Sequence, residues 1–64
     1  MRLGKNLKAA RINCELAQEE VSKTLYVSQQ TISNWEKEIS TPDINNLIKI
    51  SELYHVSIES LLKE

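Results

Sequence analysis

Two adjacent glutamines, Gln29 and Gln30, open a short stretch in which amide and hydroxyl side chains stand where Glu and Lys are usual. The serine before them, Ser28, can accept hydrogen bonds from the free backbone N–H groups of a new helix, which is expected to reach Glu36 or Lys37. A glutamine amide carries donors and an acceptor, and it can bond to N6 and N7 of adenine at the same time. The stretch therefore favours a helix that reads base edges in the major groove of DNA.

The apolar residues of this stretch decide which side of the helix faces solvent. Ile32 and Trp35 are three positions apart and are predicted to face the core, which also disfavours Trp35 as a stacking platform for a base. An ordinary polar helix face is the alternative interpretation of the outer side. The candidate base contacts are the serine at the helix start and the outward side chains after it: Ser28, Gln29, Gln30, Ser33 and Asn34.

Another helical pattern lies directly before this one. It runs from Gln18 to Leu25, with Val21 inward and the small Ser22 beside it, and only two residues separate it from Ser28. Two helices joined this tightly must cross at a steep angle, as in a helix-turn-helix unit.

Three further helices are predicted from apolar spacing and capping residues. Their expected bounds are Arg2 to Cys14, Ile44 to Tyr54, and a short last helix after the cap Ser57 that carries Ile58, Leu61 and Leu62. Pro42 ends any continuing helix, and Asp43 is expected to cap the helix after it. The inner face of that helix is expected to hold Ile44, Leu47, Ile48 and Ser51. Since no strand pattern is present, the predicted fold class is all-α, a compact bundle of five helices in one domain over residues 1–64.

Length and charge set further limits. A chain of 64 residues is expected to bury only roughly 60% of its unfolded surface, so dimerisation would help its stability. The formal net charge is -1, but residues 1–37 hold six basic and four acidic side chains, whereas residues 38–64 hold two and five. This difference favours binding of a polyanion by the N-terminal half. A surface of mixed, solvated charges is the alternative, and it explains the charge distribution about as well.

Several classes of function are not expected. Cys14 and His55 are too few ligands for a metal site, and one cysteine cannot form an internal disulfide. No Ser/His/Asp set, carboxylate constellation or Gly-rich phosphate loop can be assembled, so neither an enzyme nor a cofactor is expected. No leader and no apolar run near the roughly 20 residues of a membrane span is present, which favours a soluble, cytoplasmic protein.

Taken together, these residues resemble the phage Cro and repressor (XRE-type) helix-turn-helix family. The resemblance covers nearly the whole chain, from Gly4-Lys5-Asn6-Leu7-Lys8 to Leu61-Leu62. It depends on the string Ser28-Gln29-Gln30-Thr31-Ile32, on Glu36 directly after Trp35, and on these further positions: Arg11, Gln18, Val21, Ser22, Leu25, Val27 and Pro42.

The resemblance implies a lambda-repressor-like domain in which the helix at Gln18 to Leu25 and the helix after Ser28 form the helix-turn-helix, as the second and third of the five helices. The earlier helix would lie across the DNA backbone while the later one enters the major groove. By the same likeness Gln29, Gln30 and Asn34 would contact bases, and Gln18, Thr31 and Lys37 would contact phosphates. An ion pair between Arg11 and Glu36 would tie the first helix to the end of the third.

The chain also departs from the family pattern. Glu15, Tyr26 and Glu38 occupy turn positions that are often Gly in the family, and each would cost about 1 kcal/mol if its backbone is left-handed. Ala17 stands where a capping Ser or Thr is usual, which leaves the start of the second helix less well satisfied.

Two functions remain open at this stage. The first is a sequence-specific regulator of transcription, which is expected to act as a repressor. It is expected to bind double-stranded DNA as a homodimer on a pseudopalindromic operator. Its activity would be controlled by its concentration or by a regulatory protein partner. The expected dimer contact is Ile58, Leu61 and Leu62 in the last helix. The second is an antitoxin-like or other protein-interaction module with weak or secondary DNA binding. The acidic C-terminal half and the apolar candidates for exposure, Ile50, Leu53, Ile58 and Leu62, keep this alternative open.

Overall fold

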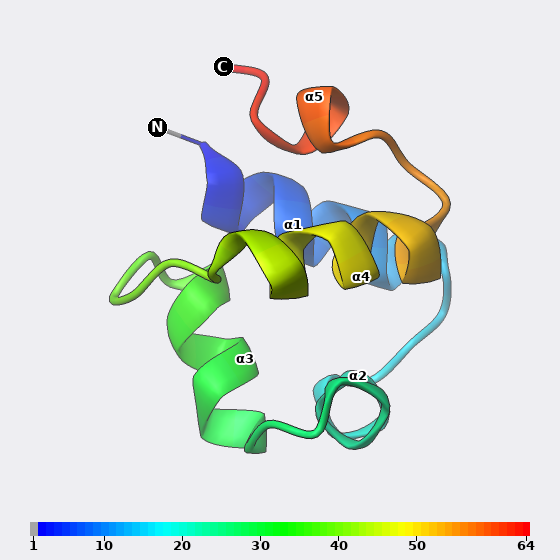
Figure 1. Ribbon diagram of the computed structural model, residues 1–64, viewed down its shortest axis with the longest axis vertical. Coiled ribbons are helices and arrows are strands. Elements are labelled where there is room, and N and C mark those ends of the chain that lie inside the picture. The colour runs from blue at the N-terminus through cyan, green and yellow to red at the C-terminus, as the bar shows by residue number, and fades with distance from the viewer. Residues whose placement is uncertain (1) are drawn as a thin grey trace.

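Five helices and no strand make up residues 2–64, the part of the chain that the computed structural model describes. They are α1 Leu3–Asn13, α2 Gln18–Leu25, α3 Gln29–Glu36, α4 Ile44–Tyr54 and α5 Ile58–Leu61 (Figure 1). The predicted all-α class is confirmed, and the bounds expected for α2 and α4 agree with the structure. None of these helices, within the described residues, combines the length and the apolar character needed to cross a membrane.

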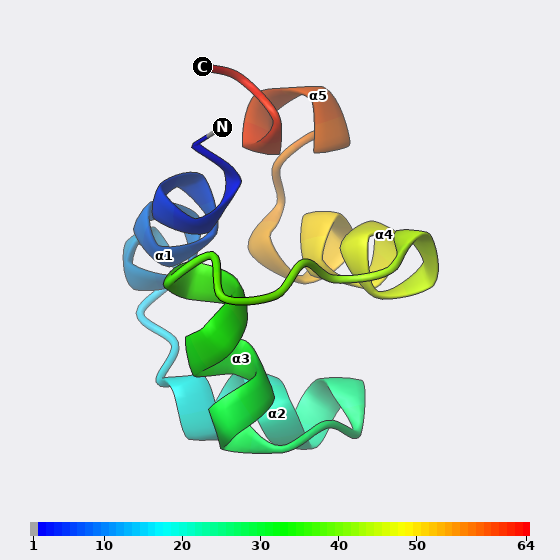
Figure 2. The same cartoon turned by 90° about the vertical axis from the view of Figure 1, so that its left-hand side faces the viewer.

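The helices divide between two ends of the molecule. Helix α1 packs against α3 and α5, α2 packs against α3, and α4 packs against α5. In two perpendicular views, α2 and the start of α3 lie at one end, while α5 and the C-terminus lie at the other (Figures 1 and 2). The helix-turn-helix end is therefore free of the C-terminal segment.

All five helices contribute side chains to one core. Trp35 is 6% exposed and Ile32 is 2% exposed, so the inner face predicted for α3 is the inner face observed. Leu61 is 1% exposed, because α5 turns it inward against the rest of the core. Leu61 is therefore not available for the dimer contact that sequence analysis assigned to it. The core residues are Leu3, Leu7, Ala10, Val21, Leu25, Ile32, Trp35, Leu47, Ile50, Tyr54 and Leu61.

The inner face predicted for α4 is right at Leu47 and wrong at Ile44 and Ile48. Ile44 and Ile48 are 62% and 41% exposed, whereas Leu47, Ile50 and Tyr54 are buried. Ile50 is therefore not one of the exposed apolar residues. The apolar positions of α4 form two overlapping helical stripes, and the position of the neighbouring helices selects the stripe that is buried.

Serine side chains cap two of the helices as predicted. Ser28 Oγ accepts a hydrogen bond from the Thr31 backbone N–H at 3.0 Å, and Ser57 Oγ accepts one from the Ser60 N–H at 2.9 Å. These bonds satisfy N–H groups that have no partner within the helix.

The starts of α4 and α2 differ in detail from the prediction. Asp43 is the first flanking residue of α4, but its carboxylate accepts from the Asn46 side chain at 2.6 Å and makes no cap bond to the backbone. Its predicted capping role is therefore wrong. At the start of α2, where Ala17 has no side-chain acceptor, Glu20 Oε1 accepts from the Ala17 N–H at 2.8 Å. Glu20 thus supplies half of a capping box.

Within residues 2–64, four residues other than glycine have left-handed backbones. The φ values are 58° at Glu15, 59° at Tyr26, 62° at Glu38 and 58° at His55. The first three are the turn positions where the family often has Gly, and His55 ends α4 in the same way. Each residue with a Cβ carries strain in this conformation.

Tyr26→Gly should stabilise the domain. The Tyr26 side chain loses little packing on replacement because the residue is 92% exposed, while glycine removes the strain at φ 59°. The expected gain in the free energy of unfolding is up to about 1 kcal/mol, visible as a higher midpoint in thermal unfolding. Tyr26→Ala is the matched control: it removes the ring but keeps Cβ, so it should give little of that gain. A midpoint equal to or below that of the unchanged chain in Tyr26→Gly would contradict the strain argument.

Candidate nucleic-acid interface

The candidate base contacts lie on the solvent side of α3. Ser28, Gln29 and Gln30 are exposed at its start, and Ser33 and Asn34 are half-buried one turn later. The tight turn after α2 and the burial of the apolar side of α3 leave this polar side outward. The side chains present hydroxyls and amides, which are both donors and acceptors.

An open hollow joins this surface to the start of α2. Its lining consists of Gln18, Gln29, Gln30 and Ser33. Gln18 was expected to contact phosphate and the other three were expected to contact bases, so the structure brings members of both sets together around one space. No charged side chain lines the hollow, and its walls therefore offer neutral hydrogen-bonding groups.

A hydrogen bond orders two of the amides. Gln30 Nε2 donates to Asn34 Oδ1 at 2.9 Å, across one turn of α3. Side chains four apart on a helix are neighbours, so this bond restrains Gln30 without any tertiary contact.

Arg11 and Glu36 form a nearly buried ion pair. Arg11 Nε lies 2.7 Å from Glu36 Oε2, and the two side chains are 11% and 5% exposed. Arg11 Nη2 also donates to Glu36 Oε1 at 3.2 Å, while Nη1 donates to the Leu16 carbonyl at 2.8 Å. The hydrogen bond to Glu36 raises the pKa of Arg11, so the guanidinium stays charged. Burial and, secondly, the charge of Glu36 raise the pKa of Tyr54 to about 12, which keeps that hydroxyl neutral.

Glu36 also holds Gln18, a contact that sequence analysis did not foresee. Gln18 Nε2 donates to Glu36 Oε1 at 3.0 Å, which links the start of α2 to the end of α3. Both residues were singled out from the sequence, but nothing in the spacing of residues 18 apart indicates that they meet. Glu36 therefore connects α1, α2 and α3 through one carboxylate.

The remaining candidate phosphate contacts lie apart from the hollow. Thr31 is half-buried, and its Oγ1 is 2.8 Å from Ser28 Oγ, so it belongs to the start of α3. Lys37 is exposed directly after the last residue of α3. The two residues thus lie near opposite ends of the helix.

Close backbone approach fixes where α3 ends against α1. The Gly4 N–H donates to Glu38 Oε2 at 2.9 Å. A Cβ at Gly4 would lie 2.5 Å from the Glu36 carbonyl oxygen and 2.8 Å from that of Trp35. In the sequence, Gly4 is recognisable only as part of the family resemblance, and its position does not predict this role.

Comparison with known proteins decides the family. A helix-turn-helix family model matches residues 7–61, which include all of α2, α3 and α4. The chain belongs to the XRE-type helix-turn-helix family. This membership confirms the resemblance drawn from the sequence, and the helix-turn-helix is the unit formed by α2 and α3.

Two relatives of this helix-turn-helix domain are named as regulators of transcription. The HTH-type transcriptional regulator ImmR of Bacillus subtilis (strain 168) is 40% identical over 62 residues, which are 97% of this chain and 49% of that protein. The HTH-type transcriptional activator BcrR of Enterococcus faecalis is 36% identical over 62 residues, which are 97% of this chain and 30% of that protein. The chain thus spans half or less of the length of these relatives.

Proposed function

We propose that this chain binds double-stranded DNA sequence-specifically and regulates transcription, with α3 in the major groove. The observation that carries the proposal is the gathering of Gln18, Gln29, Gln30 and Ser33 around one open polar hollow at the α2–α3 junction. Amides at this place can meet base edges from α3 and a phosphate from the start of α2. Membership of a family of helix-turn-helix transcriptional regulators supports the same function.

The ion pair explains how a carboxylate can lie beside a phosphate contact. Glu36 takes one N–H of the Gln18 amide, and the second N–H remains available for a phosphate oxygen. Because Arg11 balances the charge of Glu36, the carboxylate does not repel the DNA backbone. Thr31 and Lys37 are the further phosphate contacts in this proposal.

Replacing Gln29 or Gln30 with Ala should weaken binding to the cognate duplex by roughly 1–3 kcal/mol, because each loses a bidentate base contact. Binding to unrelated duplexes should change little. The cognate duplex is found by selection from random sequences, and each variant is then measured by fluorescence anisotropy at fixed salt. Site preference that survives both replacements would defeat the assignment of α3 as the reading helix.

Lys37→Ala is the matched control for a contact without sequence information. It should weaken all duplexes alike and flatten the dependence of log K on log salt by about one unit of slope. If Lys37→Ala altered the preferred sequence instead, Lys37 would not be a phosphate contact.

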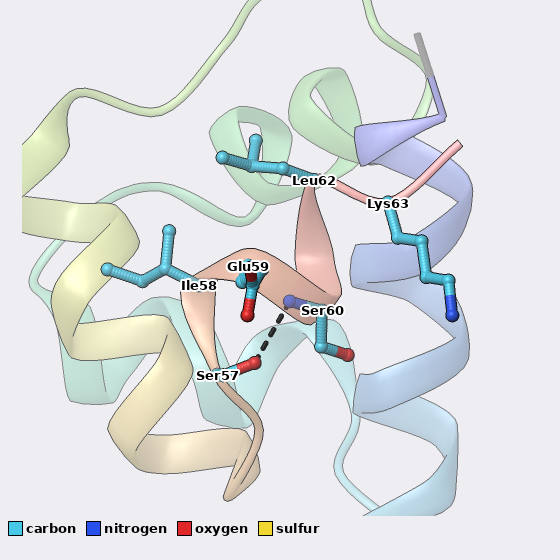
Figure 3. A pocket seen from close by; sticks show the side chains of 6 residues that line it. All are labelled: Ser57, Ile58, Glu59, Ser60, Leu62 and Lys63. Atoms are coloured by element: carbon cyan, nitrogen blue, oxygen red, sulfur yellow. Dashed lines mark hydrogen bonds between the residues drawn. The ribbon is translucent and has the colours of Figure 1, made fainter.

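We propose further that the domain acts as a two-fold dimer through α5 on a pseudopalindromic operator. Ile58 is half-buried and Leu62 is 42% exposed, and Figure 3 shows both side chains extending to the same side of α5. They line an open hollow with neighbouring polar residues of the same segment. Since α5 lies at the end of the molecule opposite α2, a copy docked there leaves the helix-turn-helix uncovered (Figure 2). Two half-sites would add their energies, with centres about 34 Å apart on the DNA.

Leu62→Asp should give monomers and weaken operator binding far more than binding to one half-site, because a charge replaces the apolar contact. Analytical ultracentrifugation at high micromolar concentration measures the first effect, and footprinting measures the second. Ile12→Asp places the same charge at a 54% exposed residue of α1 and should leave the dimer intact. An unchanged chain that sediments as a monomer and protects only one half-site would refute the dimer.

Repression is the mode of regulation that we propose. A dimer bound to an operator excludes other proteins from the same DNA, and this requires no contact beyond those described. Transcription in vitro from a promoter that overlaps the selected site should therefore fall as the protein is added. A rise in transcription would instead assign activation.

A protein-interaction module of antitoxin-like type is the second candidate. It is favoured by the exposed apolar residues that the DNA proposal does not use, Ile39 at 69%, Ile44 at 62% and Ile48 at 41%. The two candidates differ in a simple measurement. A regulator binds a selected duplex with strong salt dependence, whereas an interaction module shows only weak binding to all duplexes.

A further inference from the structure

The hydrogen bond between Gln30 and Asn34 limits what the Gln30 amide can recognise. Gln30 is exposed, and its Nε2 donates one N–H to Asn34 Oδ1 at 2.9 Å. Asn34 itself is half-buried, and its backbone carbonyl accepts from the Ile39 N–H at 2.9 Å and the Ser40 N–H at 3.4 Å. The acceptor for Gln30 therefore belongs to a fixed part of α3, at the point where the chain turns toward α4.

Adenine and guanine differ in the partners that they require from an amide. In the major groove adenine presents the N7 acceptor and the N6 donor, while guanine presents two acceptors, N7 and O6. An unrestrained glutamine meets adenine with its oxygen and one N–H, and it meets guanine with its two N–H groups. Once one N–H of Gln30 is bound to Asn34, one N–H and the oxygen remain. This remainder matches adenine and lacks a donor for guanine.

We propose that Asn34 is a specificity-determining residue, which orients the Gln30 amide to select adenine and reject guanine. The inference rests on the proposed function, since it requires Gln30 to contact a base. It adds the identity of that base, and it assigns Asn34 a positioning role in place of a simple contact. Rejection of guanine follows because binding it would break the bond to Asn34 and leave Oδ1 without its partner in the interface.

The test compares duplexes that differ at one base pair. Gln30→Ala first locates the pair at which the full chain loses discrimination between A·T and G·C. The ratio of affinities for the two duplexes is then measured in the unchanged chain, in Asn34→Ala and in Asn34→Asp. Because each ratio is taken within one variant, any change in the folded fraction cancels.

We expect the unchanged chain to prefer adenine at this position. Asn34→Ala removes the acceptor, and the ratio of the affinity for the adenine duplex to that for the guanine duplex should fall roughly two- to tenfold. This range lies between the effect of losing an exposed side-chain pair and the effect of leaving an acceptor unpaired. Asn34→Asp keeps an acceptor oxygen at the same place, so it should preserve the ratio while its negative charge weakens both duplexes alike.

Three results would separate the possible failures. A ratio unchanged in Asn34→Ala, with discrimination lost in Gln30→Ala, would overturn the role of Asn34 and leave base reading by Gln30 in place. If the unchanged chain preferred guanine and Asn34→Ala abolished that preference, the inference would be overturned. The hydrogen bond would then run in the opposite sense, with the Asn34 amide donating to Gln30. Discrimination that survives Gln30→Ala at every position would defeat the proposed base reading itself.

Discussion

Arg11→Met should lower the free energy of unfolding by about 3–5 kcal/mol, because it leaves the charge of Glu36 buried and unpaired. The Glu36 side chain is only 5% exposed, and Arg11 provides two of its three hydrogen bonds. The same change leaves the Leu16 carbonyl without the donor that Arg11 Nη1 provides. Urea denaturation of the variant measures the loss. In a domain of 64 residues a loss of this size is a large part of the total stability.

An exposed ion pair in the same chain is the control. Lys23 Nζ lies 3.7 Å from Glu19 Oε2, with side chains 77% and 65% exposed. Since solvent screens such pairs, Lys23→Met should change stability by no more than about 0.5 kcal/mol. If Arg11→Met cost no more than Lys23→Met, the buried pair would not have the role assigned to it.

A double variant distinguishes a lost attraction from a stranded charge. Arg11→Met combined with Glu36→Met removes both charges, so it should be more stable than Arg11→Met alone. A loss of stability in the double variant equal to the sum of the losses in the two single variants would show that the two side chains act independently. The Gln18 amide loses its acceptor in this background, so DNA binding should stay weak even where folding recovers.

The helix-turn-helix was predictable from local pattern. The cap at Ser28, the apolar spacing of Ile32 and Trp35 and the short link after Leu25 are all encoded within a few residues of one another. Positive φ at Tyr26 could be expected as well, because the family often places Gly there. The Arg11–Glu36 contact came only from the resemblance, since two charges 25 positions apart carry no signal of proximity.

Features that depend on contacts between helices could not be predicted from the local sequence pattern. The buried stripe of α4 and the inward position of Leu61 are selected by packing among α1, α4 and α5. The candidate site shows the same limit: the outward amides of α3 were predictable, but the bond from Gln18 to Glu36 depends on how α2 crosses α3. Helical periodicity states which residues share a face and leaves open which face another helix covers.

The approach of α1 to α3 is a further feature of this kind, and a single glycine controls it. Gly4 lies in the first turn of α1, where its N–H meets Glu38 Oε2 and its Cα faces the carbonyls that end α3. Glu38 provides this acceptor despite its left-handed backbone, so the side chain that strains the turn also holds the start of α1. Glycine in a helix normally costs stability relative to alanine, and here the cost is offset by close packing.

Gly4→Ala should therefore destabilise the domain by about 2–3 kcal/mol, the reverse of the gain of about 1 kcal/mol expected at an open helical site. The added methyl would lie 2.5 Å and 2.8 Å from the backbone oxygens of Glu36 and Trp35, which cannot rotate away, so α1 must shift from α3. Thermal and urea unfolding measure the loss, and Lys5→Ala at the exposed neighbouring position should stay within about 0.5 kcal/mol of the unchanged chain. Glu38→Ala in the Gly4→Ala background tests which atoms are responsible, because the Glu38 side chain, 2.6 Å from the place that the added methyl would take, is flexible. Stability restored by that second change would assign the clash to the side chain and overturn the argument from backbone approach.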